Sequence, residues 1–119
     1  MKILITDDSA FMRTYLERIL QEYGRCHTAS NGREGLDAFR QAMLGREPFD
    51  LVVMDIDMPE MNGLEATRRM RQLEDMAKSA PGEKSKIVIL SRYDDSERMM
   101  EAQFESEADM YLTKPVEEA

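Results

Sequence analysis

The 119-residue chain contains no tryptophan and one cysteine, and its 16 basic residues are outnumbered by 24 acidic ones. A lone Cys26 cannot form an intramolecular disulfide, so a hydrophobic core must stabilise the fold, and we expect a reducing, cytoplasmic setting. The formal net charge of -8 argues against nucleic acid or an anionic membrane as a partner and favours a cation. No apolar run approaches the roughly 20 residues that cross a bilayer, and no signal-peptide core follows Met1.

Five short runs of strand-forming residues alternate with segments of helical spacing. The strands are predicted at 2–6, 26–30, 51–54, 87–90 and 110–113, and the helices at 10–22, 33–44, 64–77 and 95–106. In the first helix, an apolar face recurs at steps of three and four, formed by Met12, Leu16, Ile19, Leu20 and Tyr23. Right-handed crossovers between such strands predict a mostly parallel sheet with helices on both faces.

The length suits a single domain, residues 1–119. The continuously apolar strands at 51–54 and 87–90 are expected in the centre of the sheet, buried on both sides. Segment 77–86 is expected to form a surface loop, and 116–119 would begin a fifth helix that the sequence does not complete. The second and third helices are expected to bury Leu36, Phe39 and Met43, and Leu64, Met70 and Leu73, respectively.

Polar side chains follow four of the predicted strands at their carboxyl ends. They are Asp7 and Asp8 after the first, Asp55 and Asp57 after the third, Ser91 after the fourth and Lys114 after the fifth. Ligands of an open parallel sheet bind beyond these ends, so the groups are expected to meet at one edge. Clustered carboxylates repel one another, and Mg2+, which prefers oxygen ligands, is the usual remedy. An aspartate here could attack a phosphoryl donor, with Mg2+ and Lys114 offsetting the charge of the transferred group and Ser91 donating to its oxygens.

Each of these residues has a simpler explanation when taken alone. Asp8 or Ser9 could be the N-cap of the first helix, because both residue types accept hydrogen bonds from its orphan amides. His27 lies on the weakest strand, away from the strand ends, and is expected at the surface rather than as a ligand or phosphocarrier. Cys26 is expected to be a small core residue. The coincidence of four strand ends is what favours a functional site.

Together these residues resemble the receiver domain of two-component response regulators, and within that family the small chemotaxis regulators. The resemblance extends over essentially the whole chain. It rests on Asp7-Asp8 before Ser9, on the string D-I-D-M-P-E-M-N-G from Asp55 to Gly63, on Ser91, and on Y-L-T-K-P from Tyr111 to Pro115. It implies a flavodoxin-like, doubly wound α/β fold with five parallel strands in the order 2-1-3-4-5.

The resemblance also implies a role for each matching acid. Asp55 would be the phosphoacceptor and would contact the metal, and Asp8 would be a direct Mg2+ ligand. Asp7 would bind Mg2+ through water, and Asp57 would supply its backbone carbonyl. Gly63 would end the turn, begun at Met58-Pro59, that leads into the third helix.

A conformational switch is implied in the same way. Lys114 would pair with the phosphoryl group, and a cis peptide bond is expected before Pro115. The Ser91 hydroxyl would move toward the phosphoryl oxygens and the Tyr111 ring would turn into the vacated space; alternatively, Tyr111 is a static, half-exposed strand residue. The switch would bias a partner-binding surface made of the fourth helix, fifth strand and fifth helix.

Two positions depart from the family pattern. Arg92 stands where a small residue usually borders the donor's path, and its guanidinium could hinder the donor or bind phosphate and slow hydrolysis of the acyl phosphate. Glu107 replaces the glycine that usually ends the fourth helix, which removes the easy left-handed cap. On that helix, Met99, Met100 and Phe104 would either form part of a partner surface or pack in the core.

The leading interpretation is a signalling module that receives a phosphoryl group on Asp55 from a histidine kinase or phosphotransfer protein. It would act on an unknown downstream protein and would turn over no external substrate. A pseudo-receiver, which docks partners while Arg92 suppresses phosphorylation, is an alternative. A third candidate is a phosphatase, because D-I-D from Asp55 resembles the D-x-D of haloacid-dehalogenase-type enzymes, although those carry it on the first strand of larger chains.

Overall fold

The computed structural model of the protein describes residues 1–92 and 107–114, without the side chains of Pro81, Arg92 and Lys114. Several predictions therefore lie outside the described residues. They are the fourth helix with Met99, Met100 and Phe104, the start of a fifth helix at 116–119, and the peptide bond before Pro115.

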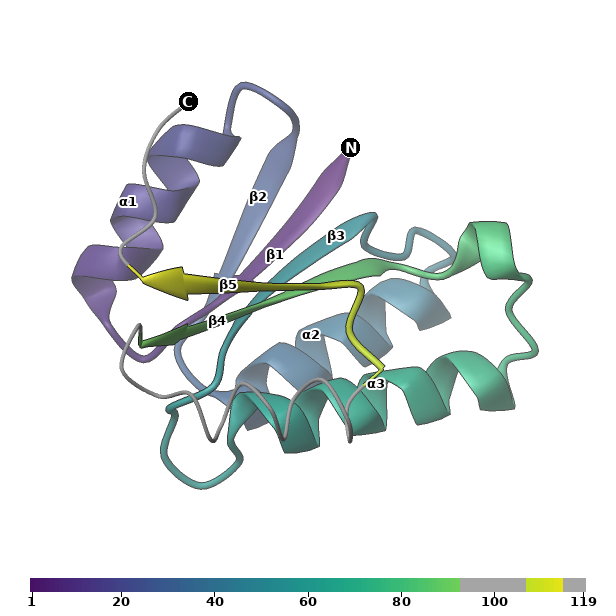
Figure 1. Ribbon diagram of the computed structural model, residues 1–119. Helices are drawn as coiled ribbons and strands as arrows, with labels where there is room; N and C mark the ends of the chain where they lie inside the picture. The colour runs from purple at the N-terminus through teal and green to yellow at the C-terminus, as the bar shows by residue number, and fades with distance from the viewer. Residues whose placement is uncertain (93–106, 115–119) are drawn as a thin grey trace.

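The described residues form five strands, three α-helices and one 3-10 helix (Figure 1). In order they are β1 (Lys2–Thr6), α1 (Ala10–Leu20), β2 (Arg25–Ala29), α2 (Gly32–Leu44), β3 (Leu51–Asp55), α3 (Gly63–Met76), the 3-10 helix η1 (Pro81–Glu83), β4 (Lys86–Arg92) and β5 (Met110–Lys114). All strand pairs are parallel, and the sheet order is β2-β1-β3-β4-β5. The predicted flavodoxin-like strand order is confirmed.

The helices cover the sheet from two sides, with α1 on one face and α2 beside α3 on the other (Figure 1). Because successive strand residues point to opposite faces, the central strands supply two separate cores. Leu4, Val52, Met54, Ile87 and Ile89 form one core with α2 and α3. Ile3, Ile5, Val53 and Leu90 form the other with Leu16 of α1. The predicted burial of the central strands on both sides is confirmed.

The apolar faces of the helices agree with the predicted spacing except at one end. Leu16 is buried and Met12 and Leu20 pack around it, but Tyr23 is 64% exposed. The helix ends at Leu20, where the Tyr23 N–H donates to the Leu20 carbonyl and the chain turns toward β2, so the helical phase no longer applies. The prediction that Tyr23 belongs to the core face was therefore wrong.

The weakest predicted strand, β2, lies at the edge of the sheet and is largely exposed. His27 is exposed, as expected, with its ring edge-on to Phe49 at a centroid distance of 5.5 Å. Cys26 is half-buried against the core on the α1 side rather than fully enclosed. The predicted surface loop at 77–86 contains η1, and it also buries Ser85 before β4 begins.

Candidate functional site

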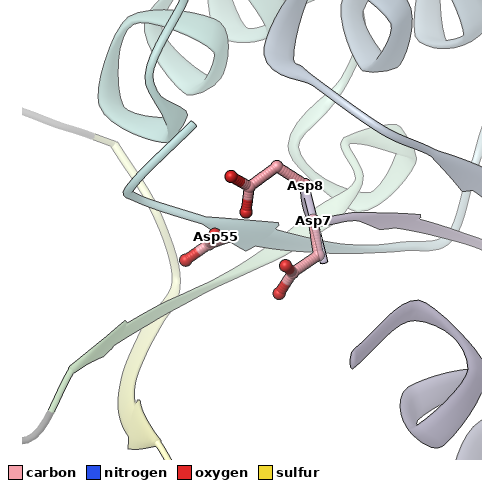
Figure 2. Close-up of side chains that lie close together, drawn as sticks. All are labelled: Asp7, Asp8 and Asp55. Carbon is pink, nitrogen blue, oxygen red and sulfur yellow. The ribbon is translucent and has the colours of Figure 1, made fainter. Parts of the chain in front are cut away.

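Three aspartates meet at the carboxyl ends of β1 and β3. Asp7 and Asp8 follow β1, Asp55 is the last residue of β3, and the two strands are hydrogen-bonded neighbours. One carboxylate oxygen from each aspartate lies within 4.8 Å of the others. Figure 2 shows the three carboxylates around a common space. Asp7 and Asp55 are buried, with exposed fractions of 0% and 3%, whereas Asp8 is exposed to solvent.

This cluster has the chemistry of a magnesium site. Mg2+ binds oxygens at about 2.0–2.1 Å, so two oxygens on one ion lie at most about 4.2 Å apart. The three carboxylate oxygens lie within 4.8 Å of one another, so they would have to move together only slightly to meet this spacing. Two of the three acids are buried. Like charges repel one another more strongly away from water, so a divalent cation bound there relieves more repulsion than it would at the surface. Asp7, Asp8 and Asp55 therefore fit a hard divalent cation.

Backbone contacts fix Asp7 at the end of β1. The Ser9 N–H donates to Asp7 Oδ1 at 2.9 Å, and the Asp7 N–H donates to the Ala29 carbonyl at 3.1 Å. Arg13 Nη1 donates to the Asp7 carbonyl at 2.8 Å, which ties the first turn of α1 to the site. Sequence reasoning missed Arg13, because no motif distinguishes it from Arg18, the other basic residue on that helix.

Ser9, and not Asp8, caps α1. Its Oγ accepts a hydrogen bond from the Met12 N–H at 3.2 Å, and Ser9 has the extended backbone typical of an N-cap. The N-cap role that was the simpler explanation for Asp8 therefore belongs to Ser9. The Asp8 carboxylate lies in the acidic cluster instead.

Backbone hydrogen bonds hold the loop between β3 and α3, one of them to the neighbouring strand β4. The Ile56 N–H donates to the Leu90 carbonyl at 3.0 Å, and the Gly63 N–H donates back to the Ile56 carbonyl at 3.0 Å. Asn62 Oδ1 then caps α3 by accepting from the Glu65 N–H at 3.0 Å. Asp57 lies within this closed loop, half-buried, and its proposed role as a carbonyl ligand stays a prediction.

The remaining candidates lie on β4 and β5. Ser91 is fully buried, one residue beyond Leu90, which pairs with Asp55. Tyr111 pairs with Ile89 and is half-buried against the core on the α2 and α3 side. Arg92 and Lys114 are register partners at the carboxyl ends of β4 and β5, and their side chains lie outside the described atoms.

Glu107, the second departure from the family pattern, is exposed just before β5. Its backbone carbonyl accepts a hydrogen bond from Arg71 Nε at 2.9 Å. The structure therefore describes how this position is held, while its effect on the predicted fourth helix lies outside the described residues.

Comparison with known proteins establishes the family. Residues 3–119 match the family model described as the response regulator receiver domain. The chain therefore belongs to the response regulator receiver domains of two-component signalling. No helix in the described ranges is long and apolar enough to cross a membrane.

Relatives of two kinds resemble the chain. Chemotaxis protein CheY of Halobacterium salinarum is 34% identical over 115 residues, which cover 96% of this chain and 84% of that protein. Probable histidine kinase 2 of Oryza sativa subsp. indica is 30% identical over 127 residues, and the match spans 98% of this chain but 12% of the kinase. A crystal structure of a variant receiver domain of the histidine kinase CKI1 from Arabidopsis thaliana is 28% identical, with a TM-score of 0.82 and coverage of 95% and 80%.

Proposed function

We propose that the chain is a phosphoacceptor that receives a phosphoryl group on Asp55 in a Mg2+-dependent reaction. The observation that carries the proposal is the meeting of Asp7, Asp8 and Asp55 at one edge of a receiver-domain sheet. A histidine kinase or a phosphotransfer protein is the proposed donor, and the likeness to receiver domains of histidine kinases supports this choice. The proposed setting is cytoplasmic.

In the proposed reaction, a carboxylate oxygen of Asp55 attacks the phosphorus of the donor. A new O–P bond forms as the bond to the donor's imidazole nitrogen breaks, and its electron pair leaves with the imidazole, which then takes a proton from water. The chain holds Asp55 for this attack through the strand pairing of β3 with β1 and β4. The product is an aspartyl phosphate on the protein.

Four residues are proposed to hold the magnesium ion. Asp8 and Asp55 would bind through carboxylates, Asp57 through its backbone carbonyl and Asp7 through a water molecule. When bound, Mg2+ supplies positive charge that offsets both the acids and the phosphoryl oxygens. The backbone contacts of Asp7 keep its carboxylate in place before any cation arrives.

The proposed output is a change at β4 and β5. Lys114 would pair with the phosphoryl oxygens, and the buried Ser91 hydroxyl would donate to one of them. The half-buried Tyr111 lies on the neighbouring strand and would follow Ser91 inward. If the side chains of β4 and β5 can pack in two arrangements, the added charge favours one of them and thereby changes the surface that the partner contacts. The downstream partner would bind the face formed by the predicted fourth helix, β5 and the predicted fifth helix.

The test is the intact mass of the protein after incubation with acetyl phosphate and Mg2+. We expect one added phosphoryl group per chain, absent in Asp55→Asn and in a metal-free sample. Asp37→Asn, which removes an exposed acid on α2 with a side chain 58% exposed, is the matched control and should be phosphorylated like the unmodified chain.

The alternatives give different results in the same experiment. A folded protein that binds Mg2+ without forming the adduct would support the pseudo-receiver, and Arg92→Ala would then test whether that side chain blocks the donor. Repeated turnover of an external phosphate ester would support the D-x-D phosphatase and contradict our proposal that the chain is not an enzyme of that kind.

A further inference from the structure

A buried arginine lies at the opposite end of the sheet from the three aspartates. The Arg71 side chain, on α3, is 7% exposed and uses four of its five N–H donors within the described residues. Nε donates to the Glu107 carbonyl at 2.9 Å, and Nη1 to Glu74 Oε1 at 2.7 Å and the Ser85 carbonyl at 2.8 Å. Nη2 donates to Asp109 Oδ2 at 2.8 Å. One side chain thus joins α3 to the segments that precede β4 and β5.

The partners of Arg71 are themselves held in place. Glu74 Oε2 accepts from the Ser85 N–H at 2.7 Å, and Asp109 Oδ2 also accepts from the Ile87 N–H at 2.8 Å. The Asp109 N–H in turn donates to the Ile87 carbonyl at 2.9 Å. We use the name Arg71 clamp for the side chains of Arg71, Glu74 and Asp109. These bonds make the clamp a fixed junction of α3, β4 and the start of β5.

The two acids of the Arg71 clamp differ in their surroundings. The Glu74 side chain is 3% exposed, so it keeps the arginine charge paired inside the protein. The Asp109 side chain is 39% exposed and lies two residues before Tyr111 on β5. Removing a deeply buried partner of an ion pair disrupts folding, whereas a half-exposed partner can be changed with water replacing its contacts. Asp109 is therefore the place where the clamp can be loosened in a folded protein.

The clamp joins two elements, α3 and β5, whose other parts reach the proposed site. Helix α3 begins at Gly63 against the carbonyl of Asp55, and eight residues later it carries Arg71. The residue that Arg71 holds, Asp109, leads directly into β5, which carries Tyr111 and Lys114. A shift of α3 relative to the start of β5 would move these β5 residues relative to Asp55.

We infer that Arg71 is a positioning residue that, through Asp109, fixes the start of β5 against α3 and so preorganises β5 for the phosphoryl group. The effect on β5 depends only on the contacts described above, whereas the effect on phosphoryl binding rests on the proposed function. Without the clamp, β5 must be ordered when the phosphoryl group binds, and affinity for that group falls. Affinity for Mg2+ alone is unchanged, because its proposed ligands lie at the carboxyl ends of β1 and β3 and in the loop after β3.

The test compares Asp109→Asn with Asp75→Asn. Both replacements keep the side-chain shape and remove one negative charge. The Asp75 side chain, however, lies on the surface of α3 and is 61% exposed, and its one described side-chain contact is an ion pair with Lys84 at 3.3 Å. Hydrogen bonds to charged groups are stronger than neutral ones, so we expect amide hydrogens of residues 107–112 to exchange about tenfold faster in Asp109→Asn. Exchange in Asp75→Asn should match that of the unmodified chain. Arg71→Lys, which keeps the charge and loses the planar fork, should resemble Asp109→Asn.

A second readout separates positioning from simple stabilisation. With Mg2+ present, the affinity of Asp109→Asn for beryllofluoride, a phosphoryl mimic, should fall about tenfold, while its affinity for Mg2+ alone is unchanged. Equal exchange rates in Asp109→Asn and Asp75→Asn would overturn the inference. Faster exchange with unchanged beryllofluoride affinity would also overturn it, because the clamp would then serve stability alone. Failure of the unmodified chain to bind beryllofluoride would instead contradict the proposed function, and the exchange comparison would still decide whether the clamp fixes β5.

Discussion

The first residue of α3, Gly63, lies directly against the backbone carbonyl of Asp55. A Cβ atom at Gly63 would come within 2.1 Å of the Asp55 oxygen and within 2.9 Å of Met54 Cγ. Gly63 does not have a positive φ angle; in this loop the left-handed residue is Glu60, with φ 69°. The glycine is therefore required because the helix begins immediately beside the Asp55 carbonyl, and not because the turn needs its conformational freedom.

We expect Gly63→Ala to damage both stability and function. The added methyl group must displace either α3 or the end of β3, since the atom that it meets belongs to the backbone. Overpacking of this kind lowers the free energy of unfolding by about 1–3 kcal/mol. Displacement of Asp55 should also slow phosphorylation by acetyl phosphate. Urea unfolding and intact mass over time measure the two effects.

Gly82→Ala is the matched control for this change. A Cβ at Gly82, in η1, meets no atom within 4 Å, so its free energy of unfolding should stay within about 0.5 kcal/mol of the unmodified value. Equal stability and equal phosphorylation rates for the two variants would show that Gly63 does not position Asp55.

Much of the fold could be predicted from hydrophobic spacing alone. The alternation of strands and helices predicted the parallel sheet, and the continuously apolar strands at 51–54 and 87–90 are indeed central. The polar groups at the strand ends were predicted to meet because the carboxyl ends of parallel strands share one edge, and three of them, Asp7, Asp8 and Asp55, form a cluster. Such predictions succeed because the pattern repeats over many residues and topology then leaves few choices.

The Arg71 clamp, which the sequence did not predict, joins residues far apart in the chain. Arg71 and Asp109 are separated by 38 positions, and nothing in the local pattern pairs them. Arginine usually lies at the surface, yet Arg71 is buried and hydrogen-bonds to the segment that precedes β5. The prediction for Tyr23 was wrong because the helical spacing of apolar residues continues for three residues after the helix itself has ended. Single contacts of this kind depend on tertiary packing, and the spacing of apolar residues along the sequence does not predict them.

Asp8→Asn should weaken stabilisation by Mg2+ and raise stability without it. In the metal-free protein, removing one of three neighbouring carboxylates relieves repulsion, so the urea midpoint should rise. At a Mg2+ concentration one hundred times its dissociation constant, the unmodified protein gains about 2.7 kcal/mol, and Asp8→Asn should gain clearly less at the same concentration. Urea unfolding with and without Mg2+ measures both effects.

The control for Asp8→Asn is Asp37→Asn, which removes one exposed charge that does not belong to the acidic cluster. Its response to Mg2+ should equal that of the unmodified chain. If Asp8→Asn and Asp37→Asn respond to Mg2+ alike, Asp8 is not a ligand of the ion.

Ser9→Ala should destabilise α1 without preventing Mg2+ binding. Its Oγ is the acceptor for the Met12 N–H, and loss of such an N-cap costs about 1 kcal/mol. Ser30→Ala, which removes a hydroxyl bonded to the exposed Glu34 carboxylate, should have a smaller effect on unfolding. A stability of Ser9→Ala equal to that of the unmodified chain would show that another group, such as Asp8, can take over the cap.

The thiol of Cys26 should be poorly reactive in the folded protein. Burial, and secondarily the negative charge of Glu17, raise the pKa of this thiol, so the folded chain keeps its proton at a pH where the unfolded thiol, with a pKa of about 8.5, ionises. Alkylation near that pH should therefore be slower in the native protein than in urea. Glu17→Gln removes the smaller cause and should accelerate alkylation only partly.

The same shift in the pKa of Cys26 sets the direction of a pH effect on stability. Above about pH 8.5 the unfolded chain binds fewer protons at this thiol than the folded chain does, so the free energy of unfolding falls as pH rises. The decline continues until the pH passes the raised pKa of the folded thiol, and below about pH 8.5 the thiol contributes no pH dependence. Cys26→Ala should lose this part of the decline, which urea unfolding between pH 7 and pH 10 can measure. An unchanged slope in Cys26→Ala would assign the decline to other groups and contradict the role of the buried thiol.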